Sequence, residues 1–334
     1  MKEMMSDYAA VRHGGAGLIE LSSVRGRIRV SGSEATMFLN GLITNDIKAL
    51  AENRWMPAAF PTVQGRLIGA VRVVRGNGPT FLIDTEATSH EAVLKTISRF
   101  TLAGDFKVSD VSAETALLSV QGKRATEVVE KVFEKSFSDL PRNGVAETEW
   151  QNASVTIFRA THTAEDGFDV VIDLAHAAQL RQSLLDAGAQ PVGEDTLEML
   201  RVEAGIARYG RDMDETSIVP ETNLDDAVSY TKGCYVGQEI IVRIKHRGHV
   251  AKKLTGLKLD TDQQIDPGTV IRSTDNQEIG KVTSAVVSPR LGPIALGYVR
   301  YEHLGPGTNV LIGDIAATIT ELPFVRGSWY QTNG

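Results

Sequence analysis

Apolar residues in this chain follow two alternating patterns, one with a period of two and one with a period of three to four. Residues 17–30 end in an alternation that is typical of a strand with one wet face. Apolar residues then recur at helical spacing after Ser33, which we expect to cap a helix. Residues 67–74 and 80–84 flank a Gly-Asn-Gly-Pro turn, which predicts a hairpin.

The same alternation of strand-like and helix-like patterns recurs further along the chain. We predict helices over 89–102, 123–137 and 175–187, and strands over 106–110, 115–120, 153–159 and 168–172. This mixture favours α+β sandwiches, with helices on one face of each sheet, over a doubly wound parallel sheet. Beyond Leu254, short apolar runs separated by Pro and Gly predict a small β-barrel or β-sandwich. The boundary falls near residue 250.

A short helix is predicted from Asp195 to Ala204, because Asp195 and Glu198 have capping-box spacing and Gly205 follows. Glu203 lies at the end of this helix, beside the negative pole of the helix dipole, where a carboxylate gains nothing locally. We therefore expect Glu203 either to be exposed or to be compensated by the N–H donors of a ligand.

The amino-acid composition argues against several classes of protein. The 334 residues carry 35 Lys and Arg against 42 Asp and Glu, so the net charge of −7 argues against a generally basic nucleic-acid binder. The single cysteine excludes an intramolecular disulfide and a CxxC metal site. The N-terminus lacks a signal-peptide core, and no window approaches the roughly 20 apolar residues of a membrane span. We expect a soluble cytoplasmic protein.

The lone thiol lies in the densest candidate segment, residues 231–239 (TKGCYVGQE), where two glycines allow close backbone approach. Cys234 can be a small buried hydrophobe, which is a common fate of a free cysteine. It can also be a functional thiol, since Lys232 and the cations downstream would favour the thiolate. Both interpretations stay open.

Residues 241–253 carry five cations and no carboxylate, so the local field should attract anions. A solvated edge strand protected by its charges is the alternative. A zinc site from Cys234, His246 and His249 is disfavoured, because HxxH in a strand would point the two rings to opposite faces.

Two segments resemble a known family: RVEAGIARYGRDMDETSIVPET and KGCYVGQEIIVRIKHRGHVAKKL. They are similar to the YgfZ-type folate-binding proteins, which are relatives of the glycine-cleavage T-protein, the aminomethyltransferase. The resemblance implies a three-domain cloverleaf around a central hole, with two ferredoxin-like α+β domains and a C-terminal antiparallel β-barrel. The implied boundaries are 1–50 plus 112–245 for a discontinuous first domain, 51–111 for the second and 250–330 for the barrel.

The resemblance also implies a ligand, tetrahydrofolate or a one-carbon derivative, in the central hole. Glu203 would hold the pterin, because a carboxylate suits its N–H donors. Tyr209, Asn45 and Asp46 would line the hole, and Arg243 and Arg247 would face the glutamate tail. The implied functional thiol is Cys234, accompanied by Lys232, Gln238 and Glu239.

The function implied in this way is assistance in the assembly or repair of iron–sulfur clusters, in 4Fe–4S enzymes such as radical-SAM proteins that modify tRNA. The partners would be such enzymes or assembly proteins, bound transiently by a monomer. The alternative is a tetrahydrofolate-dependent aminomethyltransferase, and whether the chain turns over a substrate stays open. The acidic Gly-Gly-x-x-Asp segment of the transferases corresponds here to residues 64–69 (QGRLIG), which hold no carboxylate.

A third hypothesis is an RNA-binding module on residues 243–253. The acidic composition and the 6% of aromatic residues count against it.

Overall fold

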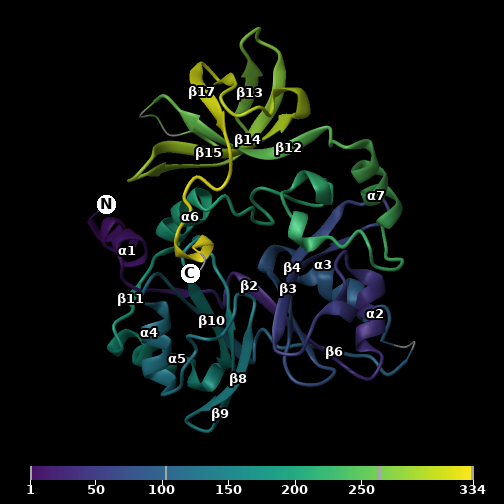
Figure 1. Ribbon diagram of the computed structural model, residues 1–334, viewed down its shortest axis with the longest axis vertical. Coiled ribbons are helices and arrows are strands. Elements are labelled where there is room, and N and C mark those ends of the chain that lie inside the picture. The colour runs from purple at the N-terminus through teal and green to yellow at the C-terminus, as the bar shows by residue number, and fades with distance from the viewer. Residues whose placement is uncertain (1, 102–103, 262, 264, 332–334) are drawn as a thin grey trace.

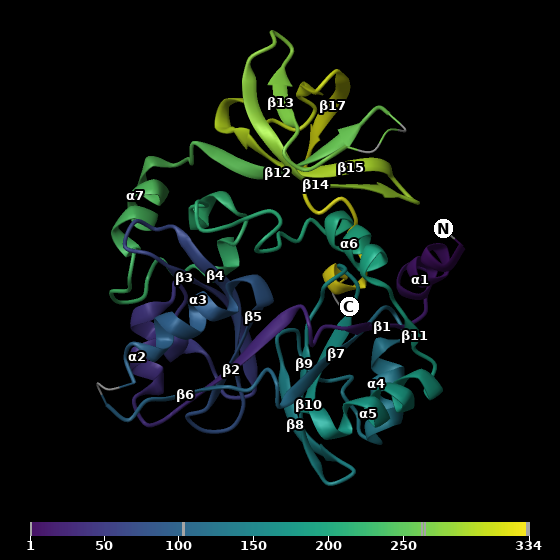
Figure 2. The same ribbon diagram turned by 180° about the vertical axis from the view of Figure 1, so that it is seen from behind.

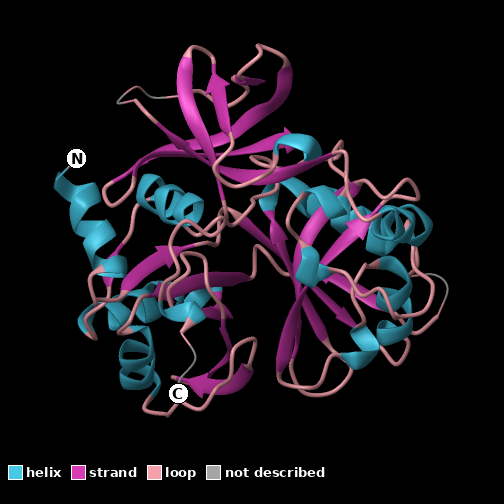
Figure 3. Cartoon of the chain, turned by 45° about the horizontal axis from the view of Figure 1, so that its top comes forward, coloured by secondary structure: helices cyan, strands magenta, loops and turns pink. Residues whose placement is uncertain are grey.

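The structure is a computed structural model that describes residues 2–101, 104–261, 263 and 265–331. The chain forms three lobes that meet around a common centre, which Figure 1 shows from one side and Figure 2 from the other. Two lobes combine helices and sheet, whereas the third is built of strands (Figure 3). The α+β class and the C-terminal β-barrel predicted from the sequence are confirmed.

The first lobe is a six-stranded sheet in the order β11-β1-β7-β10-β9-β8. Its strands are β1 (Gly17–Glu20), β7 (Thr115–Gln121), β8 (Val145–Trp150), β9 (Ala153–Arg159), β10 (Gly167–Asp173) and β11 (Gln190–Pro191). The helices α4 (Ala125–Phe133) and α5 (Leu174–Asp186) cover one face, and α1 (Lys2–Arg12) and α6 (Glu194–Glu203) pack at the other.

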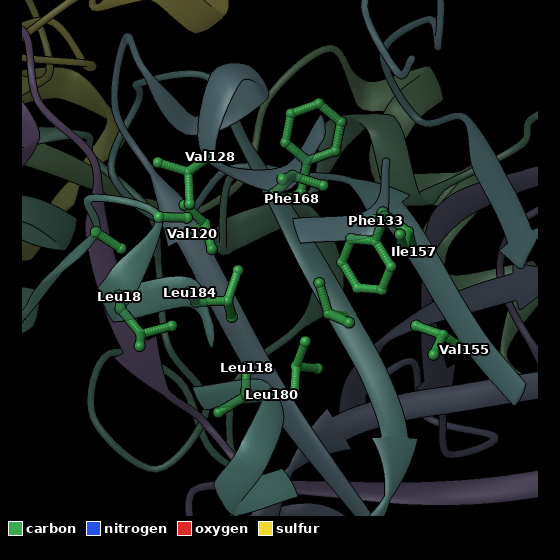
Figure 4. Packing of buried hydrophobic residues seen from close by; sticks show 14 of the residues in the cluster. Leu18, Leu118, Val120, Val128, Phe133, Val155, Ile157, Phe168, Leu180 and Leu184 are labelled. Carbon is green, nitrogen blue, oxygen red and sulfur yellow. The ribbon is translucent and has the colours of Figure 1, made fainter. Parts of the chain in front are cut away.

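The alternation of side chains along β7 explains why both faces are covered. Leu118 and Val120 point into a cluster with α4 and α5, which Figure 4 shows from close by. Leu117 points to the other face, where Tyr8 and Leu200 cover it. Each such aliphatic or aromatic side chain contributes roughly 1.5 to 3 kcal/mol when fully buried.

The second lobe is a five-stranded sheet in the order β3-β4-β5-β2-β6. Its strands are β2 (Arg25–Ser31), β3 (Arg54–Pro61), β4 (Leu67–Arg75), β5 (Phe81–Glu86) and β6 (Lys107–Asp110). The helices α2 (Ala35–Leu42) and α3 (Ala87–Ser98) and the 3-10 turn η1 (Ile47–Ala49) belong to the same core. The β4–β5 hairpin confirms the prediction from the Gly-Asn-Gly-Pro turn.

The two α+β lobes share one connectivity: strand, helix, three-stranded meander, helix, strand. In each lobe the first of these strands runs into its helix through a glycine with positive φ, Gly32 at 116° and Gly122 at 126°. A Cβ at Gly32 would lie 2.2 Å from the Asp105 carbonyl oxygen, and one at Gly122 would lie 2.6 Å from the Gly15 carbonyl oxygen. Glycine is therefore required at both corners.

The third lobe is a closed barrel in the order β12-β15-β14-β13-β16-β17. Its strands are β12 (Lys252–Leu259), β13 (Val270–Ser273), β14 (Glu278–Ser288), β15 (Gly292–Arg300), β16 (Asn309–Ile312) and β17 (Ile315–Thr320). The barrel encloses its own apolar core, and its outer face packs through Tyr298 and Leu296 against Val202 of α6. Short 3-10 turns lie at η4 (Tyr301–His303) and η5 (Ser328–Tyr330).

A long connection joins α6 to the barrel and packs on the second lobe. It contains η2 (Val219–Glu221), η3 (Asp225–Ala227) and α7 (Gln238–Arg247). Tyr209, Tyr235 and Ile241 share a cluster with Ala59 of β3 and Leu67 of β4. The predicted strand over 241–253 is therefore wrong: a helix occupies 238–247, and a strand starts only at Lys252.

The sheets also change the expected domain boundaries. Residues 25–50 carry β2, α2 and η1, which belong to the second sheet, so the assignment of all of 1–50 to the first domain is wrong. Likewise, much of the connection within 205–241 packs on the second lobe rather than the first. The chain passes between the two sheets near residues 21–25 and 111–115.

Several predicted helix ends differ from the observed ones. Ser33 does not cap α2, because its hydroxyl donates to the Asp105 carboxylate. The Asp195 capping box does not form, since α6 begins at Glu194 without a side-chain cap and Glu198 pairs with Arg201. The helix expected over 89–102 ends at Ser98, and residue 102 lies outside the described residues.

Candidate functional site

A cavity lies where the lobes meet, and it has two adjoining parts. The inner cavity has a volume of about 180 Å³ and the outer cavity about 670 Å³. Five residues line both parts, namely Pro57, Thr161, Ile206, Ala207 and Leu224. The barrel contributes Leu254, Thr255 and Leu304 to the outer cavity. All three lobes therefore build this central cavity.

The inner cavity combines apolar walls with fixed charges. Leu21, Val24 and Val71 line it beside Arg25, Arg72, Glu86 and His162. Apolar walls with a few convergent polar groups are typical of sites for small organic ligands. From β4 the cavity receives Ala70, Val71 and Arg72, none of which is a carboxylate.

Arg72 links the two α+β lobes beneath this cavity. Its Nε donates to Asp84 of β5 at 2.5 Å, and its Nη1 lies 2.6 Å from Asp169 of β10. Its Nη2 is buried and has no hydrogen-bond partner among the residues that the structure describes. A buried N–H without an acceptor is costly. The Arg72 guanidinium lies 5.8 Å from the centre of the Trp55 ring and 5.0 Å from that of the Phe158 ring.

Both carboxylates that hold Arg72 are buried and ionised. Burial alone would raise the pKa of Asp84, but the Arg25 and Arg72 charges outweigh it and keep the pKa below its ordinary value. Burial likewise opposes ionisation of Asp169, yet His162 and Arg72 lower its pKa. Asp169 lies 2.9 Å from Nε2 of His162, which fixes the orientation of a ring that lines the cavity.

A second set of charges adjoins the first through Arg25, which pairs with both Asp84 and Glu86. Glu86 lies 2.5 Å from Arg25 and 3.2 Å from Arg208. Arg201 of α6 pairs with Glu198 and with the buried Asp212. The cavity is thus bordered by an ion-pair network whose members come from β2, β5, α6 and the loop after α6.

Glu203 has neither of the two environments expected from its place at the end of α6. It is fully buried, and the chain itself supplies its donors: Tyr8 at 2.9 Å, Arg12 at 2.8 Å and Ser288 at 2.5 Å. It does not line the inner or the outer cavity. Its carboxylate clamps the N-terminal helix to the barrel, which corrects the expectation of a ligand-facing acid.

The Lys232 ammonium lies at the C-terminal end of α2. It donates to the carbonyl oxygens of Asn40 at 2.6 Å, Ile43 at 2.9 Å and Asn45 at 2.7 Å. Burial lowers the pKa of Lys232 to about 8, although the Asp46 charge opposes this shift. A cation in this position satisfies helix carbonyls that have no partner within the helix.

The other predicted cavity residues divide into two groups. Tyr209 is buried and lines the inner cavity, and burial raises the pKa of its phenol. Asn45 lies next to the outer cavity, because its amide donates to the carbonyl oxygens of Pro57 and Asp226. Asp46 instead caps η1 by accepting from the Lys48 N–H, and it lines neither cavity.

The predicted thiol group lies on the outer surface of the second lobe. Cys234 is exposed, just before α7. Gln238 and Glu239 begin α7, and Glu239 pairs with Arg243 one turn later at 2.5 Å. Arg243 and Arg247 are exposed and line neither part of the central cavity, so they do not face a tail bound there.

Four polar residues that line the inner cavity were not predicted from the sequence, namely Arg25, Arg72, Glu86 and His162. Asp169, which pairs with Arg72 and His162, was not predicted either. The signal was present but ambiguous, since Arg72 and Asp84 interrupt otherwise apolar strands and an isolated charge in a strand is usually solvent-facing.

Among the described residues no helix is long and apolar enough to span a membrane. No group of three or more His, Cys, Asp or Glu side chains within that part of the chain could hold a metal ion.

The fold and the central cavity define a class: two α+β lobes and a C-terminal barrel around a shared cavity. Comparison with known families is consistent with this class. Residues 1–232 match the GCVT N-terminal domain, and residues 252–326 match the glycine cleavage T-protein C-terminal barrel domain. The chain belongs to the GCVT family.

Its relatives include enzymes. The aminomethyltransferase of Rubrobacter xylanophilus is 34% identical over 325 residues, covering 96% of this chain and 86% of the relative. That of Thermotoga neapolitana is 30% identical, covering 97% and 90%. The crystal structure of glycine cleavage system aminomethyltransferase T from Bartonella henselae superposes with a TM-score of 0.89 at 26% identity, covering 97% and 90%. The narrower YgfZ-type assignment stays a prediction.

Proposed function

We propose that this chain binds tetrahydrofolate in the central cavity, with the pterin in the inner cavity and the glutamate tail in the outer cavity. The observation that carries the proposal is the shape and charge of this space within a GCVT-family fold. A small part with fixed charges adjoins a part several times larger, which suits a ligand with a flat polar head and a long body.

The side chains of the inner cavity fit a pterin. Arg72 Nη2 offers a buried N–H to a ring acceptor, and the Glu86 carboxylate can accept from the amino group and ring N–H. Leu21, Val24 and Val71 supply apolar surface for the ring faces. At the outer cavity Lys253, 3.2 Å from Asp225, is the cation available to a tail carboxylate.

The reaction that we propose is transfer of a one-carbon unit to folate, the activity for which the aminomethyltransferase relatives are named. The carbon–sulfur bond and the carbon–nitrogen bond of a lipoyl-carried aminomethyl group break, and two carbon–nitrogen bonds form on the folate amines. Of the two protons that those amines release, one goes to the sulfur, which leaves as a thiol, and one to the amino group, which leaves as ammonia. His162, oriented by Asp169, is the group at the cavity wall that can hold or return a proton.

A second candidate function is folate-dependent assistance to iron–sulfur cluster proteins, as in YgfZ-type proteins. Two observations favour it: Cys234 is exposed, and β4 supplies no carboxylate to the inner cavity. An exposed thiol can contact a partner's cluster or persulfide, although one thiolate cannot hold a cluster alone. Both candidates share the folate site and differ in turnover.

One pair of measurements tests the proposal and separates the candidates. Calorimetry with tetrahydrofolate should give saturable binding, and an assay with an aminomethylated lipoyl carrier should yield methylene-tetrahydrofolate and ammonia. Binding without turnover would instead favour the second candidate and contradict the transfer reaction. Absence of folate binding would contradict both.

Cys234→Ser gives an independent readout. Because Cys234 lies outside the central cavity, we expect this variant to bind tetrahydrofolate like the parent chain. If the second candidate is correct, the variant fails to restore cluster-enzyme activity in a strain that lacks the gene, whereas the neighbouring Thr231→Ser variant restores it. Full restoration by Cys234→Ser would remove the thiol from the function.

A further inference from the structure

The outer face of the barrel carries an unusual row of side chains. In the antiparallel register Lys252 of β12 lies directly opposite Arg300 of β15, and Lys281 of β14 lies directly opposite Tyr298 of β15. Directly opposed residues share a face of the sheet, as do residues two apart on one strand. The four side chains therefore project on the same side of three adjacent strands.

This arrangement is unfavourable without a counter-charge. Like charges that face each other across a strand pair destabilise a sheet. Within the described part of the chain, Lys252, Lys281 and Arg300 form no ion pair. Lys252 Nζ lies 5.0 Å from the centre of the Tyr298 ring, which offers only a cation–π contact.

The same four residues line a cavity of about 510 Å³ between the barrel and the loop 210–217, which we call the barrel cleft. Tyr298 is only 8% exposed, and its buried hydroxyl has no hydrogen-bond partner among the described residues. The neighbouring Ser217 hydroxyl donates to Asp214 at 3.3 Å. The cleft is thus lined by four cations, of which Arg211 comes from the loop, and by one buried hydroxyl that has no hydrogen-bond partner in the described part of the chain.

The acids that line the cleft are held by other groups or lie at its rim. The buried Asp212 accepts from Arg201, Thr283 and Ser284. Asp214 accepts from the Thr216 and Ser217 hydroxyls within its own turn. Glu278 is exposed at the rim. Outside the cleft, the buried Glu221 lines an adjoining cavity together with Lys252 and Arg300, and it offsets part of their charge.

We propose that the barrel cleft binds a small multivalent oxyanion, a ligand bearing phosphate or carboxylate groups, held by Lys252, Lys281 and Arg300 with the Tyr298 hydroxyl as a donor. The ligand would supply counter-charge to the directly opposed Lys252 and Arg300 beyond what Glu221 provides. The site is separate from the folate site proposed above, since the loop 210–217 lies between them and Met213 of that loop lines both the inner cavity and the cleft.

The experiment is calorimetry of the full chain at low ionic strength with two probes, inorganic pyrophosphate and citrate, which distinguish phosphate from carboxylate chemistry. Saturable binding of at least one probe is expected. The Lys252→Gln/Arg300→Gln double variant should weaken it by about tenfold or more, since hydrogen bonds to charged groups are lost. Tyr298→Phe keeps the ring and should weaken binding several-fold.

Lys258→Gln is the matched control, because Lys258 is an exposed lysine on the same strand that does not line the cleft. Equal weakening by Lys258→Gln would reduce the effect to general charge attraction and overturn the proposal. Failure of the parent chain to bind either probe would also overturn it. A further result against it would be competition between the bound probe and tetrahydrofolate, because the anion would then occupy the central cavity.

Discussion

Glu203 separates two accounts of this protein, because the sequence resemblance predicts a ligand-facing acid and the structure shows a buried clamp. The substitution Glu203→Gln keeps the size of the side chain and removes its charge. In the structure that charge lies 2.8 Å from Arg12, and the same carboxylate accepts from Tyr8 and Ser288. The substitution should therefore weaken the docking of α1 and leave the cavity unchanged.

The loss in the free energy of unfolding depends on the contacts that Arg12 keeps after the substitution. Removing one partner of a buried ion pair costs about 3 to 5 kcal/mol, because the other charge is left without compensation. Here Arg12 keeps Glu165 at 3.0 Å and the Thr163 carbonyl oxygen at 2.6 Å, and the new amide oxygen still accepts. We therefore expect Glu203→Gln to lower the free energy of unfolding by about 2 to 3 kcal/mol, and Glu203→Ala by about 3 to 5 kcal/mol.

The assay is urea denaturation followed by circular dichroism, with tetrahydrofolate calorimetry on the same samples. Glu194→Gln is the control, since Glu194 is exposed in the first turn of the same helix and should cost less than about 1 kcal/mol. An unfolding free energy unchanged by Glu203→Gln, together with a tenfold or larger loss of tetrahydrofolate affinity, would refute this reasoning and restore the ligand role.

Two further predictions concern stability. Lys232→Met leaves three carbonyl oxygens at and just after the end of α2 without their donor and should lower the free energy of unfolding by about 2 to 4 kcal/mol in chemical denaturation. Substitution of the exposed Lys48 by Met should change it little. Burial and Glu203 raise the pKa of Tyr8 to about 12 from 10.0, so its contribution is complete below pH 10 and is lost as pH rises toward 12. The stability difference between the parent chain and Tyr8→Phe should shrink by up to roughly 2.7 kcal/mol over that range; a constant difference would contradict the prediction.

The sequence predicts those helices and strands whose apolar residues recur at the positions that are buried in the structure. The apolar spacing in 125–133 and 89–97 gave α4 and α3, and turn chemistry gave the β4–β5 hairpin. The same reasoning failed at α7, because Ile240, Ile241 and Val242 form a β-branched run that is typical of a strand.

Tertiary contacts decide the structure of that segment. Gly237 adopts a φ of 77° at the start of α7, where a Cβ would lie 2.4 Å from the Thr62 carbonyl oxygen. Ile241 is then fully buried against Leu67 and Tyr235, while the charged residues face solvent. Neither contact is local, so the sequence window could not reveal the helix.

The site was less predictable than the fold for the same reason. The group that borders the inner cavity joins Asp84, Arg72 and Asp169, which come from three strands in two lobes. Their pairing depends on how the lobes meet. Conversely, the sequence drew attention to Glu203 as a carboxylate at a helix end and to Lys232 as a cation near Cys234, but the partners of both are groups of the chain itself.

The central claim is that tetrahydrofolate occupies the cavity between the lobes, and a blocking variant tests it most directly. Ala207 lines both parts of the cavity, whereas Ala92 is exposed on α3. We predict that Ala207→Phe, shown to be folded by circular dichroism, loses calorimetric tetrahydrofolate binding by about tenfold or more while Ala92→Phe binds like the parent chain. Equal affinity in both variants would contradict the account, because the ligand would then lie elsewhere.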